Sequence, residues 1–150
     1  MIDKNARNEL AESLRHLVSG QITNGQFEEA AWWIKTDDAA MDAVKWKAWQ
    51  LYSDLREHRL TGRDAVSACD RRIVARFILF LHSDLEYEWP RHPLEGLRRL
   101  LVSVLSLGTI PRRVDKEWEA SGDIDVWPFI RRVDYEEALN NPKLLRGRAA

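Results

Sequence analysis

Residues 16–33, HLVSGQITNGQFEEAAWW, limit the fold more than any other stretch of the chain, because they contain the end of one helix and the start of another. Asp3 is a natural N-cap for the first helix, and Gly20 stands just past its last apolar residue, where a left-handed backbone is favoured. The apolar side chains between them recur at helical spacing: Leu10, Leu14, Leu17 and Val18. The pattern predicts a helix that begins near residue 3 and ends before Gly20.

The second helix of this hairpin has a complete set of start signals. Thr23 fits the N-cap, Gln26 stands at the position of its capping-box partner, and Ile22 can pack against Phe27 across the first turn. Local chemistry therefore predicts a helical hairpin over residues 3–34. Because capping is a sufficient reason for these residues, no function is needed to explain them.

Within residues 10–34, one pattern is shared with a known family, through Gly20, Ile22, Thr23, Phe27 and Glu28. It resembles the helical hairpin of the SHOCT domain, a short bacterial module usually found at C-termini and associated with oligomerisation. Asn24-Gly25-Gln26 replaces the acidic pair of that family, and Ala31-Trp32-Trp33 stands where it has lysines and leucines. As a whole, the chain resembles small bacterial proteins of unknown function, which implies no activity.

Further helices follow the hairpin. Residues 36–38 can cap a third helix that extends to about His58, with the apolar residues Met41, Val44, Ala48, Leu51 and Leu55. A fourth helix begins at about Asp64 and contains the most apolar stretch of the chain, so residues 66–81 are predicted to be central. A fifth helix is expected over 94–107, between Pro93 and Gly108. Asp134 is expected to cap a last short helix through Leu139.

Two regions favour extended structure. In residues 84–93, apolar and acidic side chains alternate from Asp84 to Trp89, which indicates a period of two, and Pro90 and Pro93 disfavour a helix there. Residues 114–118 and 124–129 could pair as a short β-hairpin. The prediction is a mainly α, single-domain bundle of about five helices over residues 1–150, with a small β-hairpin in the C-terminal third and a frayed tail after about residue 142.

The formal net charge of −1 argues against a protein that binds nucleic acid mainly through its overall charge, because phosphate neutralisation needs an excess of Lys and Arg. Local charge is uneven, since residues 91–113 are basic and residues 114–137 are acidic, which predicts a dipolar surface. A basic-faced nucleic-acid module remains an alternative, and it would use Arg91, Arg98, Arg99, Arg112 and Arg113.

The sequence predicts a cytoplasmic protein without membrane contact. The residues after Met1 lack the apolar core of a signal peptide, and the most apolar run, residues 77–81, is far shorter than the roughly 20 residues of a membrane span. The one cysteine, Cys69, cannot form an internal disulfide and is expected to be a small buried residue.

Catalytic and cofactor signatures are weak. The four histidines have no zinc-ligand spacing, the glycines form no phosphate-binding loop, and no nucleophile elbow is present, so no cofactor or metal is predicted. The best catalytic candidates are Asp84, Glu86 and Glu88, which an extended strand would align, with His82 or His92 beside them. This pattern also suits the solvent face of an edge strand.

The same segment could bind a protein, with the carboxylates at the rim and Tyr87 and Trp89 as anchors. Trp127, followed by Arg131 and Arg132, is a second candidate anchor, although these rings could equally close one end of the core. We therefore expect a non-enzymatic intracellular protein-binding module, such as an adaptor or an immunity-like protein. The alternative is a small hydrolase or metal-dependent enzyme that uses the 84–88 carboxylates. Self-association through the first hairpin is also open, and it predicts that Leu14, Leu17 and Phe27 face another subunit.

Overall fold

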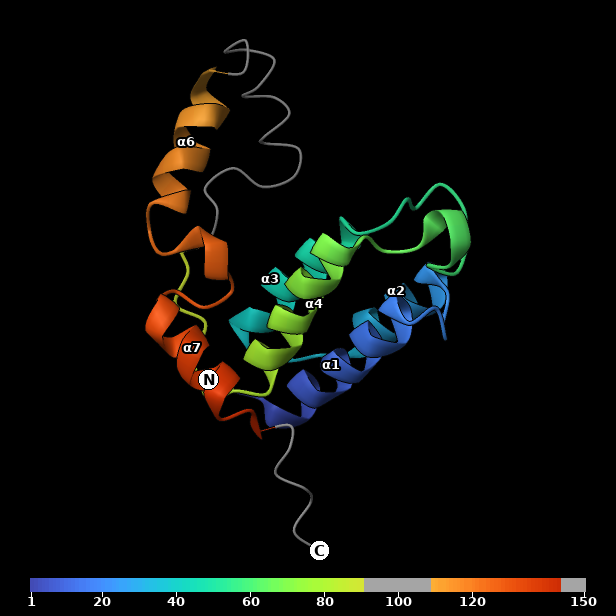
Figure 1. Ribbon diagram of the computed structural model, residues 1–150, viewed down its shortest axis with the longest axis horizontal. Coiled ribbons are helices and arrows are strands. Elements are labelled where there is room, and N and C mark those ends of the chain that lie inside the picture. Colours follow the sequence, from blue (N-terminus) through green and yellow to red (C-terminus); the bar gives the residue numbers. More distant parts are fainter. Residues whose placement is uncertain (91–108, 144–150) are drawn as a thin grey trace, which may run out of the picture.

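The computed structural model describes residues 1–90 and 109–143 (Figure 1). Over these ranges the chain is mainly helical and contains no β-strand. The α-helices are α1 (Lys4–Val18), α2 (Asn24–Trp33), α3 (Ala39–Trp49), α4 (Ala68–Leu81), α6 (Thr109–Glu119) and α7 (Arg132–Asn140). Two short 3-10 helices, η1 (Gly62–Asp64) and η2 (Ile124–Val126), complete the described elements.

The predicted capping of the first hairpin is confirmed. The Asp3 carboxylate accepts a hydrogen bond from the backbone N–H of Ala6 at 3.0 Å. At α2, Thr23 Oγ1 accepts from the Gln26 N–H at 3.1 Å, and the Gln26 side chain accepts from the Thr23 N–H at 3.0 Å. Gly20 has a φ of 71°, the left-handed conformation expected after a helix end.

Gly20→Ala is expected to lower the free energy of unfolding by about 1–2 kcal/mol, because a side chain at positive φ is strained and the new Cβ would overlap the Cγ2 methyl of Thr61. Gly62→Ala is the matched control: its φ is 58°, but a Cβ there meets open space, so its loss should be smaller. Urea unfolding measures both. An unchanged midpoint for Gly20→Ala would contradict this account of the turn.

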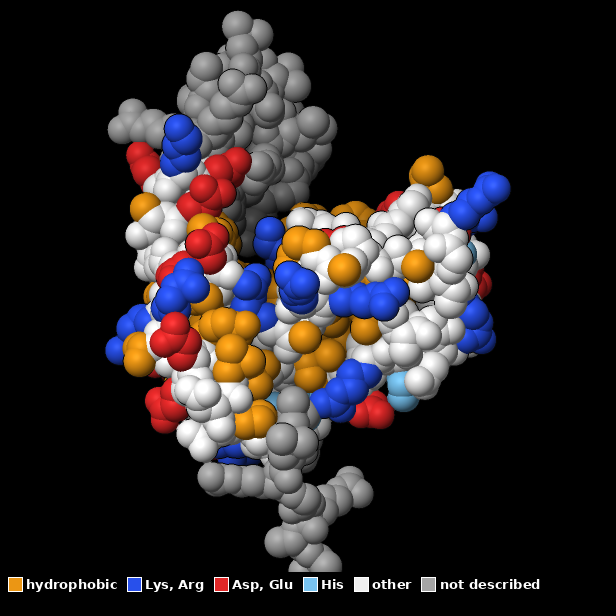
Figure 2. Space-filling model, viewed as in Figure 1, with side chains coloured by type: hydrophobic (Ala, Val, Ile, Leu, Met, Phe, Trp, Pro, Cys, Tyr) orange, Lys and Arg blue, Asp and Glu red, His pale blue; other side chains and the backbone are white. Residues whose placement is uncertain are grey.

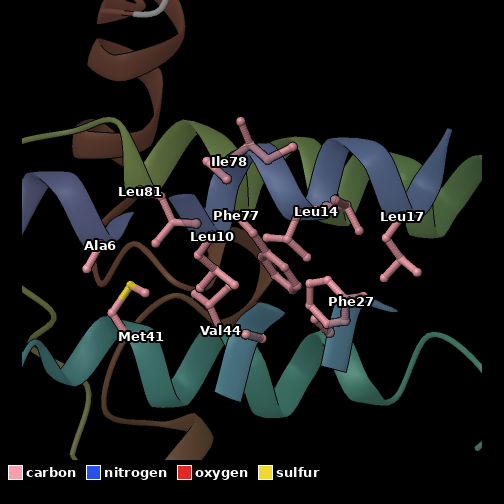
Figure 3. Packing of buried hydrophobic residues seen from close by; sticks show 14 of the residues in the cluster. Ala6, Leu10, Leu14, Leu17, Phe27, Met41, Val44, Phe77, Ile78 and Leu81 are labelled. Carbon is pink, nitrogen blue, oxygen red and sulfur yellow. The ribbon is translucent and has the colours of Figure 1, made fainter. Parts of the chain in front are cut away.

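The main core is organised by α1 and α4 together. α1 packs against α2, α3 and α4, while α4 also contacts α3 and α7. In Figure 3, α2 and α3 lie on one side of the core and α4 on the other, with the α1 leucines between them. The predicted centre at residues 66–81 is therefore shared with α1, whose inward side chains are fully buried: Leu10, Ala11, Leu14 and Leu17.

A second, smaller core lies between α4, η2 and α7. The rings of Phe80 and Phe129 meet edge to face with centroids 5.1 Å apart, and Tyr135 of α7 packs against Phe129. Arg76 holds this region to α4, because its guanidinium donates to the carbonyls of Trp127, at 2.6 Å, and Asp125. These contacts place α7 beside α4 (Figure 1).

The third helix is shorter than predicted: it ends at Trp49, whereas the apolar spacing suggested an end near His58. The buried side chain of Asn24 explains the difference. Its Nδ2 donates to the carbonyls of Ser53 and Arg56, and its Oδ1 accepts from the His58 N–H at 2.8 Å. Residues 50–60 therefore fold back onto the start of α2.

Three further predictions are wrong in detail. The fourth helix begins at Ala68, not near Asp64, because Ser67 supplies the N-cap by accepting from the Asp70 N–H. Cys69 is consequently in the first turn and exposed, not buried. The last helix begins at Arg132, and Asp134 lies inside its first turn.

The predicted β-hairpin is absent from residues 109–143, and helices take its place. Residues 114–118 belong to α6, in which Val114 and Trp118 stand one turn apart and are both half-buried. Residues 124–126 form η2, because the Asp123 carboxylate accepts from the Asp125 N–H and caps that turn. The apolar residues Val114 and Trp118 are thus spaced for one face of a helix.

Some predictions lie outside the described residues: the helix over 94–107, residues 144–150 of the tail predicted after about residue 142, and the side chains of Arg91, Arg98, Arg99, Arg112 and Arg113. Among the helices that the structure describes, none combines the length and the apolar character that crossing a membrane requires.

Candidate functional site

The 84–88 carboxylates lie on the surface, and each has a basic group nearby. The segment follows α4 as irregular chain, with Asp84, Glu86 and Glu88 exposed and the residues between them turned inward. Lys4 Nζ lies 2.8 Å from Asp84 Oδ1, and Lys143 pairs with the other oxygen. The Met1 amino group is 3.6 Å from Glu86. The negative charge of Glu88 helps to raise the pKa of Arg131, after the larger effect of Asp134.

This environment does not favour acid–base chemistry. Hydrogen bonds from Lys143 and Lys4 lower the pKa of Asp84 to about 2, which makes it a very weak base. Within residues 1–90 and 109–143, no three His, Cys, Asp or Glu side chains converge in a way that could hold a metal ion. His82 does not join the carboxylates either, since its Nε2 lies 3.1 Å from Arg15 Nη2.

Lowering the pH is expected to destabilise the protein through His82. Burial, followed by the Arg15 charge, lowers the pKa of this imidazole below its usual value. The folded state then binds fewer protons than the unfolded chain, so the free energy of unfolding falls as the pH drops through about 6.5. Urea unfolding at a series of pH values measures this slope. His82→Gln should flatten it, and an unchanged slope in that variant would contradict the assignment.

A surface depression lies beside the N-terminus, and two of the carboxylates that line it are hydrogen-bonded within the chain. It is lined by residues 1–5 and 36–38. The Asp3 carboxylate accepts from Thr36 Oγ1 at 3.0 Å, and the Asp38 carboxylate accepts from Arg7 Nε at 2.6 Å. The Asp3 and Asp38 carboxylates therefore serve the fold: both cap helices, and Asp38 also pairs with Arg7.

The predicted aromatic anchors lie inside the molecule. Trp89 and Trp127 are only 3% and 5% exposed. Trp89 Nε1 donates to the Phe129 carbonyl at 3.2 Å, and Trp127 Nε1 donates to Tyr87 Oη at 3.3 Å. Their rings close one end of the core, where a partner could not reach them without unfolding this region.

The arginines that follow Trp127 are exposed but engaged within the chain. Arg131 makes two hydrogen bonds to the Asp134 carboxylate, at 2.8 and 2.9 Å. Arg132 makes two to Asp123, at 2.8 and 3.2 Å. On the face drawn in Figure 2, most Asp and Glu side chains lie over α6 and α7, while Lys and Arg side chains gather over α4 and α1.

The hairpin side chains that were candidates for a subunit contact are buried in their own chain. Leu14 and Leu17 are fully buried, and Phe27 is almost so. Figure 3 shows them in the main core, facing the side chains of α3 and α4. The prediction that they face another subunit is therefore wrong, because the intramolecular core uses the same apolar face.

The exposed faces of α2 and α3 carry a different feature, four solvent-exposed tryptophans, which we call the tryptophan surface. Trp32 and Trp33 are 74% and 76% exposed, and Trp46 and Trp49 are 54% and 41% exposed. The rings of Trp46 and Trp49 lie 5.2 Å apart between centroids, tilted by 42°. Indole rings are large and mostly apolar, so leaving four of them in water is costly.

One hydrogen bond joins the segment after α2 to α3, and both helices pack against α1, so the helices that carry the tryptophans lie on the same side of the core. Lys45 Nζ donates to the carbonyl of Ile34 at 3.1 Å, which ties the end of α2 to the middle of α3. Ile34 follows Trp33 directly, and Lys45 stands beside Trp46 and one turn before Trp49. In Figure 3, α2 and α3 lie on the same side of the core.

The charges around the tryptophan surface are mixed. Lys35, Lys45, Glu29 and Asp42 each lie within four residues of one of these tryptophans in the sequence, and all but Lys45 are exposed. Burial lowers the pKa of Lys45; Asp42 opposes this shift and Lys35 adds to it. The tryptophans are therefore accompanied by two carboxylates and two ammonium groups on the same two helices and the residue that follows α2.

The sequence did not settle which tryptophans are exposed, although the positions of three of them around their helices indicated exposure. Trp32 and Trp33 fall on the opposite side of α2 from Phe27 and Ala31, and Trp46 falls off the apolar stripe of α3. The exposure of Trp49 had no such signal, because its position suggested a wider apolar stripe.

Comparison of the chain with protein-family models, with curated proteins and with solved structures finds no match, so the resemblance of residues 10–34 to a SHOCT-type hairpin stays a prediction.

Proposed function

We propose that the protein is an intracellular, non-enzymatic protein-binding module that contacts its partner through the tryptophan surface. The observation that carries this proposal is the exposure of Trp32, Trp33, Trp46 and Trp49, which are four of the seven tryptophans of the chain. Tryptophan is enriched among the residues that dominate binding energy at protein interfaces, and large exposed apolar patches mark interaction sites.

The surroundings of these side chains also support binding rather than a role in stability. The main core is complete without them, since α2 and α3 bury their other faces through Phe27, Ala31, Met41, Val44 and Ala48. Adaptors and immunity-like proteins act by binding another protein, so they need no catalytic set. An enzyme that uses the 84–88 carboxylates has less support, because Asp84 is held as a weak base by two lysines.

Site-specific photocrosslinking in the native host tests the proposal. p-Benzoylphenylalanine is introduced at position 33 on the tryptophan surface and, as a matched control, at position 139, where Leu139 is also an exposed apolar helix residue. The expected result is one discrete crosslinked protein species from position 33 and none from position 139. The same diffuse products from both positions would contradict a specific contact at the tryptophan surface.

A further inference from the structure

We infer that the tryptophan surface pairs with the same surface of a second copy of this chain. This inference rests on the proposed function and specifies its partner. The first argument is area: taking about 250 Å² for a whole indole side chain, the four tryptophans expose roughly 600 Å². A specific interface of standard size buries about 800 Å² on each partner. The tryptophans and their charged neighbours therefore match the area that each subunit of a stable dimer needs.

The second argument is self-complementarity. A two-fold interface brings the same patch from both subunits together, so a patch of one charge would repel its copy. The tryptophan surface avoids this problem, because Glu29 and Asp42 supply negative charge while Lys35 and Lys45 supply positive charge. Carboxylates of one copy can then pair with ammonium groups of the second copy.

The third argument concerns the aromatic centre. Trp46 and Trp49 already form a tilted ring pair on α3, one turn apart. Two α3 helices crossing about a two-fold axis would place two such pairs against each other, an arrangement in which offset or edge-to-face ring contacts add to apolar burial. A lipid surface fits less well, because Glu29 and Asp42 would face the anionic headgroups.

Sedimentation velocity of the purified full-length chain, over a wide range of concentration, tests this inference. The wild-type protein is expected to sediment at twice the mass of one chain and to dissociate on dilution. Trp33→Glu combined with Trp46→Glu should weaken the dimer by about 100-fold or more, because charged groups would replace two of the four indoles. Leu139→Glu should dimerise like the wild type. Equal urea midpoints for both variants, at a concentration where each is monomeric, would show that they fold, since all three altered side chains are exposed.

Several outcomes would overturn the inference. One is a wild-type chain that is monomeric at every concentration; another is a double variant that dimerises as well as the wild type. Co-sedimentation of a monomeric chain with phosphatidylcholine–phosphatidylglycerol vesicles, lost in the double variant, would assign the surface to lipid instead. A further outcome is that position 33 crosslinks to a different protein while the purified chain is monomeric. That result would overturn the inference of a dimer but would still support the proposed function.

Discussion

Arg7→Ala is expected to lower the free energy of unfolding by about 3–5 kcal/mol, because it leaves a buried carboxylate without its partner. Arg7 and Asp38 are 1% and 4% exposed. The guanidinium donates to both Asp38 oxygens, at 2.6 and 3.0 Å, and also to the Leu85 carbonyl at 2.8 Å. One side chain of α1 thus holds the start of α3 and the segment after α4.

The measurement is urea unfolding of Arg7→Ala beside Arg131→Ala. Arg131 makes a similar two-pronged contact with Asp134, but it is exposed, so its loss should cost no more than about 1 kcal/mol. If both variants lost the same free energy of unfolding, burial of the Arg7–Asp38 pair would not explain its contribution to stability.

The same pair predicts a loss of stability in acid. Burial by itself would raise the pKa of Asp38, but hydrogen bonds from Arg7 and from the backbone of Asp3 and Ala40 outweigh it and lower the pKa. The unfolded chain then binds the proton more readily, so this stabilisation is complete above about pH 4 and disappears as the pH falls through the lowered value. In Arg7→Ala this part of the acid dependence should shrink, which a urea series at acidic pH measures.

Phe77→Ala is expected to cost about 3–5 kcal/mol, as large-to-small changes of buried aromatic residues do. Phe77 is buried where α4 meets α1, close to Leu10 and Leu14 (Figure 3). Its ring also meets Trp127 edge to face, with centroids 5.1 Å apart. Its removal would therefore open a cavity in the main core and remove support from the 126–129 region.

Trp32→Ala is the matched control for Phe77→Ala, because it removes an even larger aromatic side chain from an exposed helix face. The free energy of unfolding of the monomer should change by no more than about 0.5 kcal/mol. Urea midpoints at a concentration where the chain is monomeric make the comparison. A large loss in Trp32→Ala would mean that this tryptophan belongs to the intramolecular core and not to a binding surface.

The candidate site shows where sequence reasoning stops. Alternation over residues 84–89 correctly separated outward carboxylates from inward aromatic residues. Pattern alone did not show that Lys143, 59 residues further along the chain, pairs with Asp84. Nor did it show that Trp89 lies against Phe129, because a buried ring and an exposed anchor look alike until the opposing surface is known.

The starts of α1 and α2 and the turn between them followed from neighbouring residues, because a cap such as Thr23 with Gln26 needs only groups within one turn. The mainly helical class followed in the same way from apolar spacing. Contacts between residues far apart in the sequence determined other parts of the fold. The Asn24 side chain binds the backbone of residues 53–58, where a longer third helix was expected. Helix α6 forms where one strand of a β-hairpin was expected. Exposure of the four tryptophans also depended on tertiary structure, because whether a helix face meets water is set by what packs against it, and that partner lies elsewhere in the chain.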